Sequence, residues 1–196
     1  LAILDPLLTI GLPQKITAAT GVDAMVHAIE AYSSKNKNNN LISRMYAIEA
    51  LKLLIGSIDQ AVFHGDSEKA RANMLKGSMF AGIAFANSPV AAVHALAYPI
   101  GGIFHIPHGL SNALILPYVL RFNQLDQKAA HAYADLCDYI WPLKDPKKGI
   151  QYKSSFFIEK LTELSERLGL ETRLRDVGIP KEACEKMAKE SMKQTR

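Results

Sequence analysis

Two side chains with metal-binding chemistry stand one helical turn apart early in the chain. Asp23 and His27 lie four residues apart in the apolar-periodic stretch TAATGVDAMVHAIEAYSS, residues 17–34, so on a helix they share one face. A buried carboxylate is costly unless it is paired or bound to a metal. The pair therefore has two explanations, an Asp–His hydrogen bond on a half-exposed face or two ligands of one ion, and the spacing alone leaves both open.

Two histidines farther along the chain extend this set. His94 lies among valine, alanine and leucine, where a lone histidine is commonly a satisfied core residue. His108 stands between a proline and a glycine at the expected start of a helix, where a lone histidine is typical of a surface. One carboxylate and three imidazoles together suit a divalent ion such as Fe²⁺ or Zn²⁺. The remaining histidines are His64 and His131, which lie in polar or exposed patterns and are left out, and His105, which stays open.

Helices are the elements that must position these side chains. Apolar residues recurring at helical spacing predict helices over 17–34, 41–63, 66–88, 108–122, 126–140, 152–168 and 180–192. A further helix is expected to begin at Pro89 and to end at Pro99 or Gly101–Gly102. Strand-like alternation is almost absent. We therefore expect an all-α helical bundle, a single domain over residues 1–196, with a short extended piece at its start.

Charge and cysteine content narrow the class of protein. The net charge is +4, and the lysine-rich stretches 144–148 and 181–196 lack the interleaved aromatic residues of a nucleic-acid surface, so we expect no nucleic-acid partner. The two cysteines, Cys137 and Cys184, form no C-x-x-C pair, so neither a redox motif nor a thiolate zinc site is expected. Two unpaired thiols favour a reducing, cytoplasmic compartment. No apolar run is long enough to span a bilayer, so no membrane partner is expected.

Long stretches of the chain resemble the iron-containing (group III) alcohol dehydrogenase family. The stretches are ITAATGVDAMVHAIEAYSS, residues 16–34, and VHALAYPIGGIFHIPHGLSNALILPYVLRFN, residues 93–123. The resemblance begins at DPLLTIGLP, residues 5–13, and continues weakly to LRDVGIPKE, residues 174–182. These motifs are long and gap-free, so the match is specific.

The resemblance implies a metal, a cofactor and a missing part. One divalent ion, usually iron, would be held by Asp23, His27, His94 and His108. The family has an N-terminal α/β domain that holds NAD or NADP, followed by a helical domain of the dehydroquinate synthase-like fold. This chain looks like the helical domain alone, with residues 1–13 as the crossover between domains. Leu8 and His108 would then contact the cofactor.

The resemblance also implies a substrate pocket and one departure from the family. Phe85 and Val90 match pocket-lining positions, and Phe104 is a plausible third apolar wall. Many members carry a proton-relay histidine where this chain has Tyr98, and a phenol with a pKa of about 10 is a poor base at neutral pH. We expect Tyr98 to hydrogen-bond toward the site without acting as the proton shuttle.

The expected function is that of a metal-dependent alcohol dehydrogenase or aldehyde reductase. Hydride would pass between a primary alcohol and NAD or NADP, with this chain supplying the metal and part of the substrate pocket. We expect the substrate to be a small alcohol or aldehyde, the full-length form to be a homo-oligomer, and the isolated chain to be inactive. The alternatives are a zinc polyol dehydrogenase of the glycerol type and a non-catalytic metal-binding helical module.

Overall fold

The chain folds into helices joined by short turns, in two compact units. The structure is a computed structural model that describes residues 3–89 and 91–193. Unit 1 covers Leu1–Pro89 and unit 2 covers Val90–Arg196. No strand occurs among the described residues, which confirms the all-α class.

Unit 1 is a three-helix assembly with a short 3₁₀ turn on it. The turn η1 (Pro6–Thr9) stands where a short extended piece was expected, because the side chain of Asp5 accepts a hydrogen bond from the backbone N–H of Leu7 at 2.9 Å. Helices α1 (Gln14–Ser33), α2 (Leu41–Phe63) and α3 (Glu68–Asn87) all pack on one another, and η1 packs on α3. Their shared core includes Met25, Ile29, Leu51, Leu54 and Ile58, each at most 1% exposed.

Local capping sets where two of these helices begin. The Asn40 side chain accepts from the backbone N–H groups of Ile42 and Ser43, and the Ser43 hydroxyl accepts from the Asn40 backbone N–H, so α2 starts with a reciprocal capping box. Ser67 caps α3, and Glu68 in its first turn complements the helix dipole, as the sequence predicts.

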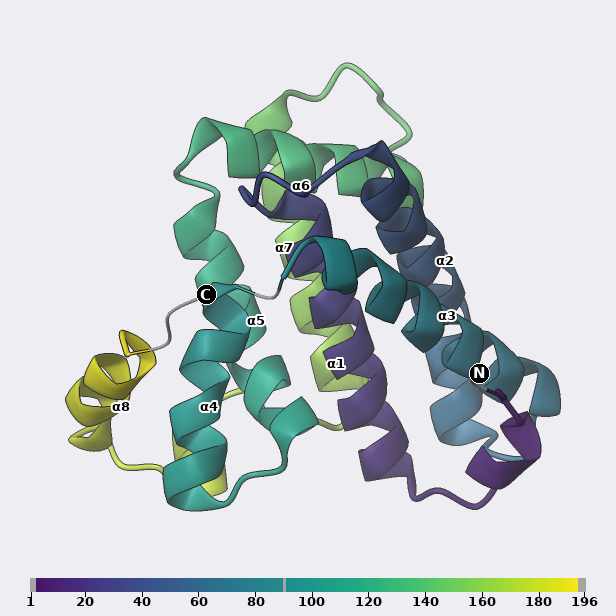
Figure 1. Cartoon of the computed structure of the whole chain (residues 1–196), viewed down its shortest axis with the longest axis horizontal. Helices are drawn as coiled ribbons and strands as arrows, with labels where there is room; N and C mark the ends of the chain where they lie inside the picture. The colour runs from purple at the N-terminus through teal and green to yellow at the C-terminus, as the bar shows by residue number, and fades with distance from the viewer. Residues whose placement is uncertain (1–2, 90, 194–196) are drawn as a thin grey trace. The chain divides into compact units, whose positions relative to one another are not determined.

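Unit 2 contains the remaining helices. They are α4 (Ala92–Phe104), α5 (His108–Asn123), α6 (Gln127–Ile140), α7 (Ile150–Arg167), the 3₁₀ turn η2 (Leu174–Val177) and α8 (Ala183–Ser191). Figure 1 shows α4 and α5, in teal, side by side, with the yellow α8 beside α4. Helix α7 packs on both α5 and α6. Tyr133, Leu136 and Phe157 are at most 1% exposed and lie in the core of this unit.

The expected start of the fourth helix at Pro89 and its expected end at Pro99 or Gly101–Gly102 are both wrong. Helix α4 begins at Ala92 rather than Pro89 and runs through Pro99 to Phe104. A proline inside a helix removes one backbone hydrogen bond and crowds the preceding turn, at a cost of about 3 kcal/mol. Burial offsets that cost, because Ile100 packs with Ile179 and Met187 in a small apolar cluster. The helix ends instead at His105, whose backbone is left-handed with φ of 57°.

No single helix among the described residues is long and apolar enough to cross a bilayer. Helices α3 and α4 meet that test only as a broken pair, by length and composition alone.

Candidate metal centre

Unit 1 carries two of the expected ligands on one face of α1. Asp23 and His27 are both half-buried, one turn apart, on a helix whose other central residues, among them Met25, Val26 and Ile29, are fully buried. The helical period alone brings the two side chains together, as the sequence predicts. This face of α1 is the most polar part of an otherwise apolar stretch.

A hydrogen bond fixes which ring nitrogen of His27 carries the proton. The Nδ1 atom of His27 lies 2.9 Å from the backbone carbonyl oxygen of Asp23. A carbonyl oxygen can only accept, so Nδ1 must donate and a neutral ring keeps its lone pair on Nε2. Metal-binding histidines are commonly oriented in this way, with one nitrogen donating to a carbonyl and the other left for the ion.

Phe85 lies against this pair. The ring centroids of His27 and Phe85 are 4.9 Å apart, and the rings are tilted by 34°. Phe85 stands near the end of α3 and is 37% exposed, so its ring contacts the imidazole and remains partly accessible to solvent. An apolar ring beside a ligand side chain is an arrangement that keeps water from one side of it.

Unit 2 carries the other two expected ligands close together. His94 lies on α4 and is 2% exposed, whereas His108 is the first residue of α5 and is exposed. Their ring centroids are 5.4 Å apart. Two imidazoles bound to one tetrahedral ion, with metal–nitrogen bonds of about 2.0–2.1 Å, place their centroids about 5 Å apart. The separation therefore fits two ligands of one ion.

Two more side chains surround His108 in unit 2. The ring of Tyr98 stacks near it, with centroids 6.1 Å apart and an interplanar angle of 27°. The side-chain nitrogen of Asn112 lies 3.2 Å from Nε2 of His108. Because the amide nitrogen can only donate, Nε2 of His108 is the accepting nitrogen. An ion at Nε2 would therefore have to replace this hydrogen bond.

Sequence reasoning missed Asn112. It is fully buried and one turn after His108 on α5. The signal in the sequence was the spacing, since an asparagine at i+4 from a candidate ligand on a helix lies within hydrogen-bonding reach of it.

The other predicted residues lie in varied surroundings. Leu8, on η1, is 82% exposed. Phe104, the last residue of α4, is partly buried against the cluster formed by Ile100, Ile179 and Met187. Val90 lies outside the described residues. His64 and His131 are exposed, as their sequence surroundings predict, and His105 is exposed at the end of α4.

A family model and several known proteins match this chain. The model is that of the Fe-containing alcohol dehydrogenase family, C-terminal, and it matches residues 17–196. Long-chain-alcohol dehydrogenase 1 of Geobacillus thermodenitrificans (strain NG80-2) is 40% identical over 195 residues, which is 100% of this chain and 48% of that protein. The 1,3-propanediol dehydrogenase of Citrobacter freundii is 37% identical over 189 residues, covering 96% of this chain and 48% of that protein.

Solved structures agree with these sequence matches. A 1,3-propanediol oxidoreductase superposes with a TM-score of 0.91 at 36% identity, over 97% of this chain and 48% of that one. An iron-containing alcohol dehydrogenase from Thermococcus thioreducens superposes with a TM-score of 0.83 at 31% identity, over 97% of this chain and 47% of that one. The chain thus spans about half the length of the relatives it matches.

Proposed function

The chain belongs to the Fe-containing alcohol dehydrogenase family, and we propose that it is the metal-binding part of an NAD- or NADP-dependent alcohol dehydrogenase that also reduces aldehydes. The single observation that carries the proposal is that the four expected ligands lie in two close pairs, one in each unit. Asp23 and His27 share one face of α1, and the rings of His94 and His108 lie 5.4 Å apart. We propose that the two units act as one metal-binding domain, because the ligand set is divided between them.

The donor set fits the family's metal. An Fe²⁺ or Zn²⁺ ion held by Asp23, His27, His94 and His108 would act as a Lewis acid toward the alcohol oxygen. A nicotinamide cofactor, in contact with Leu8 and His108, would take the hydride. Within this chain, the Nδ1–H of His27 donates to the Asp23 carbonyl and so holds the imidazole with Nε2 toward the ligand face.

The apolar residues shape the substrate side of the site. We propose that Phe85, Val90 and Phe104 line the pocket and exclude water, since Phe85 already lies against His27. Tyr98 stacks near His108 and is proposed to orient that ring or a substrate oxygen rather than to shuttle a proton. The relatives' names point to primary alcohols as substrates, from 1,3-propanediol to long-chain alcohols. They do not favour a zinc polyol dehydrogenase of the glycerol type.

The cellular compartment, the adjoining domain and the oligomeric state are also proposals. Cys137 and Cys184 are both free thiols, which supports work in a reducing, cytoplasmic compartment. We propose that residues 1–13 form the crossover to a cofactor-binding domain and that the full-length form is a homo-oligomer. No nucleic-acid or membrane partner is proposed.

Metal titration of the 196-residue chain tests the ligand set. We expect one Fe²⁺ or Zn²⁺ per chain under anaerobic conditions, measured by calorimetry and by metal analysis after gel filtration. Asp23→Ala, His27→Ala, His94→Ala and His108→Ala should each weaken binding by roughly ten- to a hundredfold or more. The controls are His64→Ala, His131→Ala and Asp135→Ala, which remove the same side-chain types from exposed positions.

Which variants lose metal affinity distinguishes the four-ligand site from its alternatives. Loss confined to His94→Ala and His108→Ala would mean that unit 2 binds the ion alone and would contradict the four-ligand site. Equal loss in the control variants would contradict the assignment altogether. Metal binding with the expected pattern of losses, in a full-length protein containing this chain that does not oxidise alcohols, would favour the non-catalytic metal-binding module.

Turnover is tested separately. We expect the 196 residues alone to bind metal without oxidising alcohols, because the relatives that catalyse are about twice as long. The assay is NAD- and NADP-linked oxidation of 1-propanol, 1,3-propanediol and 1-dodecanol by the metal-loaded chain. Robust turnover by the chain alone would contradict this expectation.

A further inference from the structure

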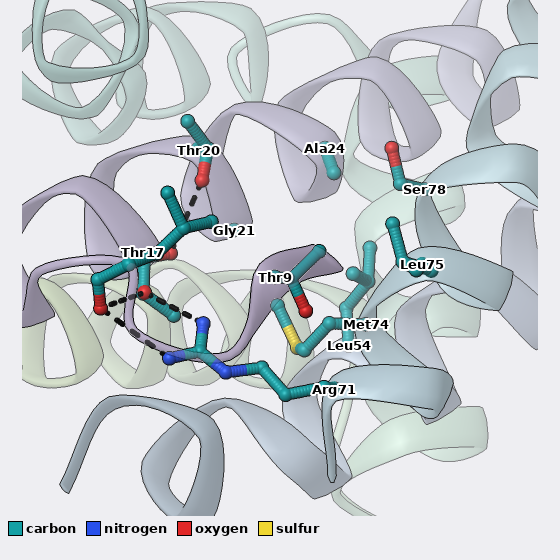
Figure 2. Close-up of a pocket in the computed structure, with 11 residues that line it drawn as sticks. Thr9, Thr17, Thr20, Gly21, Ala24, Leu54, Arg71, Met74, Leu75 and Ser78 are labelled. Carbon is teal, nitrogen blue, oxygen red and sulfur yellow. Dashed lines mark hydrogen bonds between the residues drawn. The ribbon is translucent and has the colours of Figure 1, made fainter. Parts of the chain in front are cut away.

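A pocket in unit 1, apart from the proposed ligands, is lined by one charged side chain, several hydroxyl groups and a group of aliphatic side chains. It has a volume of about 220 Å³ and lies between η1, α1 and α3, with Leu54 of α2 at its base. Figure 2 shows the Arg71 side chain extending from α3 toward Thr17 on α1, while Met74 and Leu75 of α3 line the other side. The pocket therefore offers a cation at one side and aliphatic surface at the other.

Arg71 is a buried cation with hydrogen-bonding capacity left over. It is 3% exposed. Its Nε donates to the Gly65 carbonyl at 2.9 Å, Nη1 to the Thr17 hydroxyl at 2.8 Å and Nη2 to the Leu12 carbonyl at 3.4 Å. A guanidinium has five N–H donors, so these bonds leave one N–H on each Nη.

The charge of Arg71 has no carboxylate partner within the described residues. Its three acceptors are two backbone carbonyls and one hydroxyl, all neutral. A buried charge is costly unless it is paired, and hydrogen bonds from a guanidinium to a carboxylate are stronger than those to neutral acceptors. Each Nη of Arg71 keeps one N–H for a further acceptor, and a carboxylate oxygen is an acceptor that also compensates the positive charge.

Two threonine hydroxyls of the pocket donate to backbone carbonyls and so are not donors to a bound anion. The Thr9 hydroxyl donates to the Pro6 carbonyl at 2.7 Å, and the Thr20 hydroxyl donates to the Ile16 carbonyl at 2.8 Å. Their protons are therefore directed to the backbone and not to a ligand. Phosphate or sulfate would need more donors than Arg71 supplies, whereas a monoanion with an apolar tail needs no others.

We propose that this pocket binds a short-chain carboxylate, with its carboxyl group on Arg71 and its alkyl chain against Leu54, Met74 and Leu75. At roughly 30 Å³ for each small group, the volume admits a ligand of about six or seven non-hydrogen atoms, the size of butyrate or valerate. The site is independent of the proposed metal chemistry, because none of its lining residues belongs to the ligand set.

Binding is tested on the metal-free chain, so that the carboxylate has no ion to coordinate. The chain is labelled with ¹³C in the methionine methyl groups and titrated with sodium butyrate, with 1-butanol and with sodium phosphate. We expect the Met74 methyl signal to shift saturably with butyrate, with a dissociation constant on the order of 1 mM, which is reasonable for six non-hydrogen atoms. The Met187 signal, from unit 2, should stay unchanged.

Three variants test whether the shift of the Met74 methyl signal reports binding in this pocket. Ser78→Leu adds bulk at the exposed rim and keeps all three hydrogen bonds of Arg71, so butyrate should bind at least tenfold more weakly. Gly65→Ala should weaken binding as well, because a Cβ there would lie 2.8 Å from Nη2 of Arg71 and displace the guanidinium. Lys76→Gln removes an exposed cation from the same helix, outside the pocket lining, and should leave the affinity unchanged.

Three outcomes would overturn the proposal. Equal binding of 1-butanol would make the pocket an apolar crevice in which Arg71 takes no part. Tighter binding of phosphate than butyrate would make it a general anion site. Unchanged butyrate affinity in Ser78→Leu, with native circular dichroism, would place the carboxylate elsewhere.

Discussion

Two glycines of α3, the helix that bears Phe85, allow a test of how closely α3 packs on α2. Gly77 and Gly82 both lie inside α3, so replacing either by alanine gains the same helix propensity, about 1 kcal/mol. They differ in what a side chain would meet. A Cβ on Gly77 would lie 2.7 Å from Cγ of Leu54 and 3.3 Å from the Ala50 carbonyl oxygen, whereas a Cβ on Gly82 would meet nothing within 4 Å.

Leu54 has little freedom to move away. It is fully buried on α2, and its Cγ is a branch point rather than the end of a flexible chain. Overpacking a core contact of this kind costs about 1–3 kcal/mol. Because the propensity gain is common to both variants, the difference between Gly77→Ala and Gly82→Ala isolates this overpacking cost. We expect Gly82→Ala to be more stable than the original chain and Gly77→Ala to be less stable than Gly82→Ala by about 1–3 kcal/mol.

Urea unfolding followed by far-UV circular dichroism measures both free energies. Trp141, the chain's one tryptophan, packs on Phe157 in unit 2 with ring centroids 5.7 Å apart, so its fluorescence reports on unit 2 in the same samples. A shift in circular dichroism without a shift in fluorescence would assign the effect to unit 1. Equal stabilisation by the two substitutions would refute the close approach of α3 to α2.

Three further predictions concern a cap, a thiol and the tyrosine. Asn40→Ala should lower the free energy of unfolding by about 1–2 kcal/mol, because two backbone N–H groups of α2 lose their acceptor. The control Asn38→Ala should change it by less than about 0.5 kcal/mol. Equal effects of the two variants in urea unfolding would contradict the capping box. Burial, and secondarily the charge of Asp138, raises the pKa of the Cys137 thiol. At pH 8 a thiol reagent should therefore label exposed Cys184 quickly and Cys137 slowly. Fast labelling of a Cys184→Ser variant would contradict the slow reaction of Cys137. In an active enzyme containing this chain, Tyr98→Phe should reduce the rate modestly and leave the acidic limb of the pH–rate profile in place, whereas a shift of that limb by about one pH unit would identify Tyr98 as a proton shuttle.

The sequence by itself determined the features that depend on a few neighbouring residues. The helical period places Asp23 and His27 on one face of α1, and the Asn40 and Ser67 side chains begin α2 and α3. The family also follows from sequence, because the matching stretches are long and continuous. Each of these depends on geometry within one or two helical turns, which backbone sterics and hydrogen bonding restrict to a small set of conformations.

Only the tertiary structure decided the features that join distant residues. Helix α4 continues through Pro99 because the apolar cluster around Ile100, Ile179 and Met187 outweighs the loss of one backbone hydrogen bond. The hydrogen bond from Arg71 to the Thr17 hydroxyl joins residues 54 positions apart. Neither is visible in local periodicity, since burial and the pairing of buried charge depend on which surfaces meet after the helices pack.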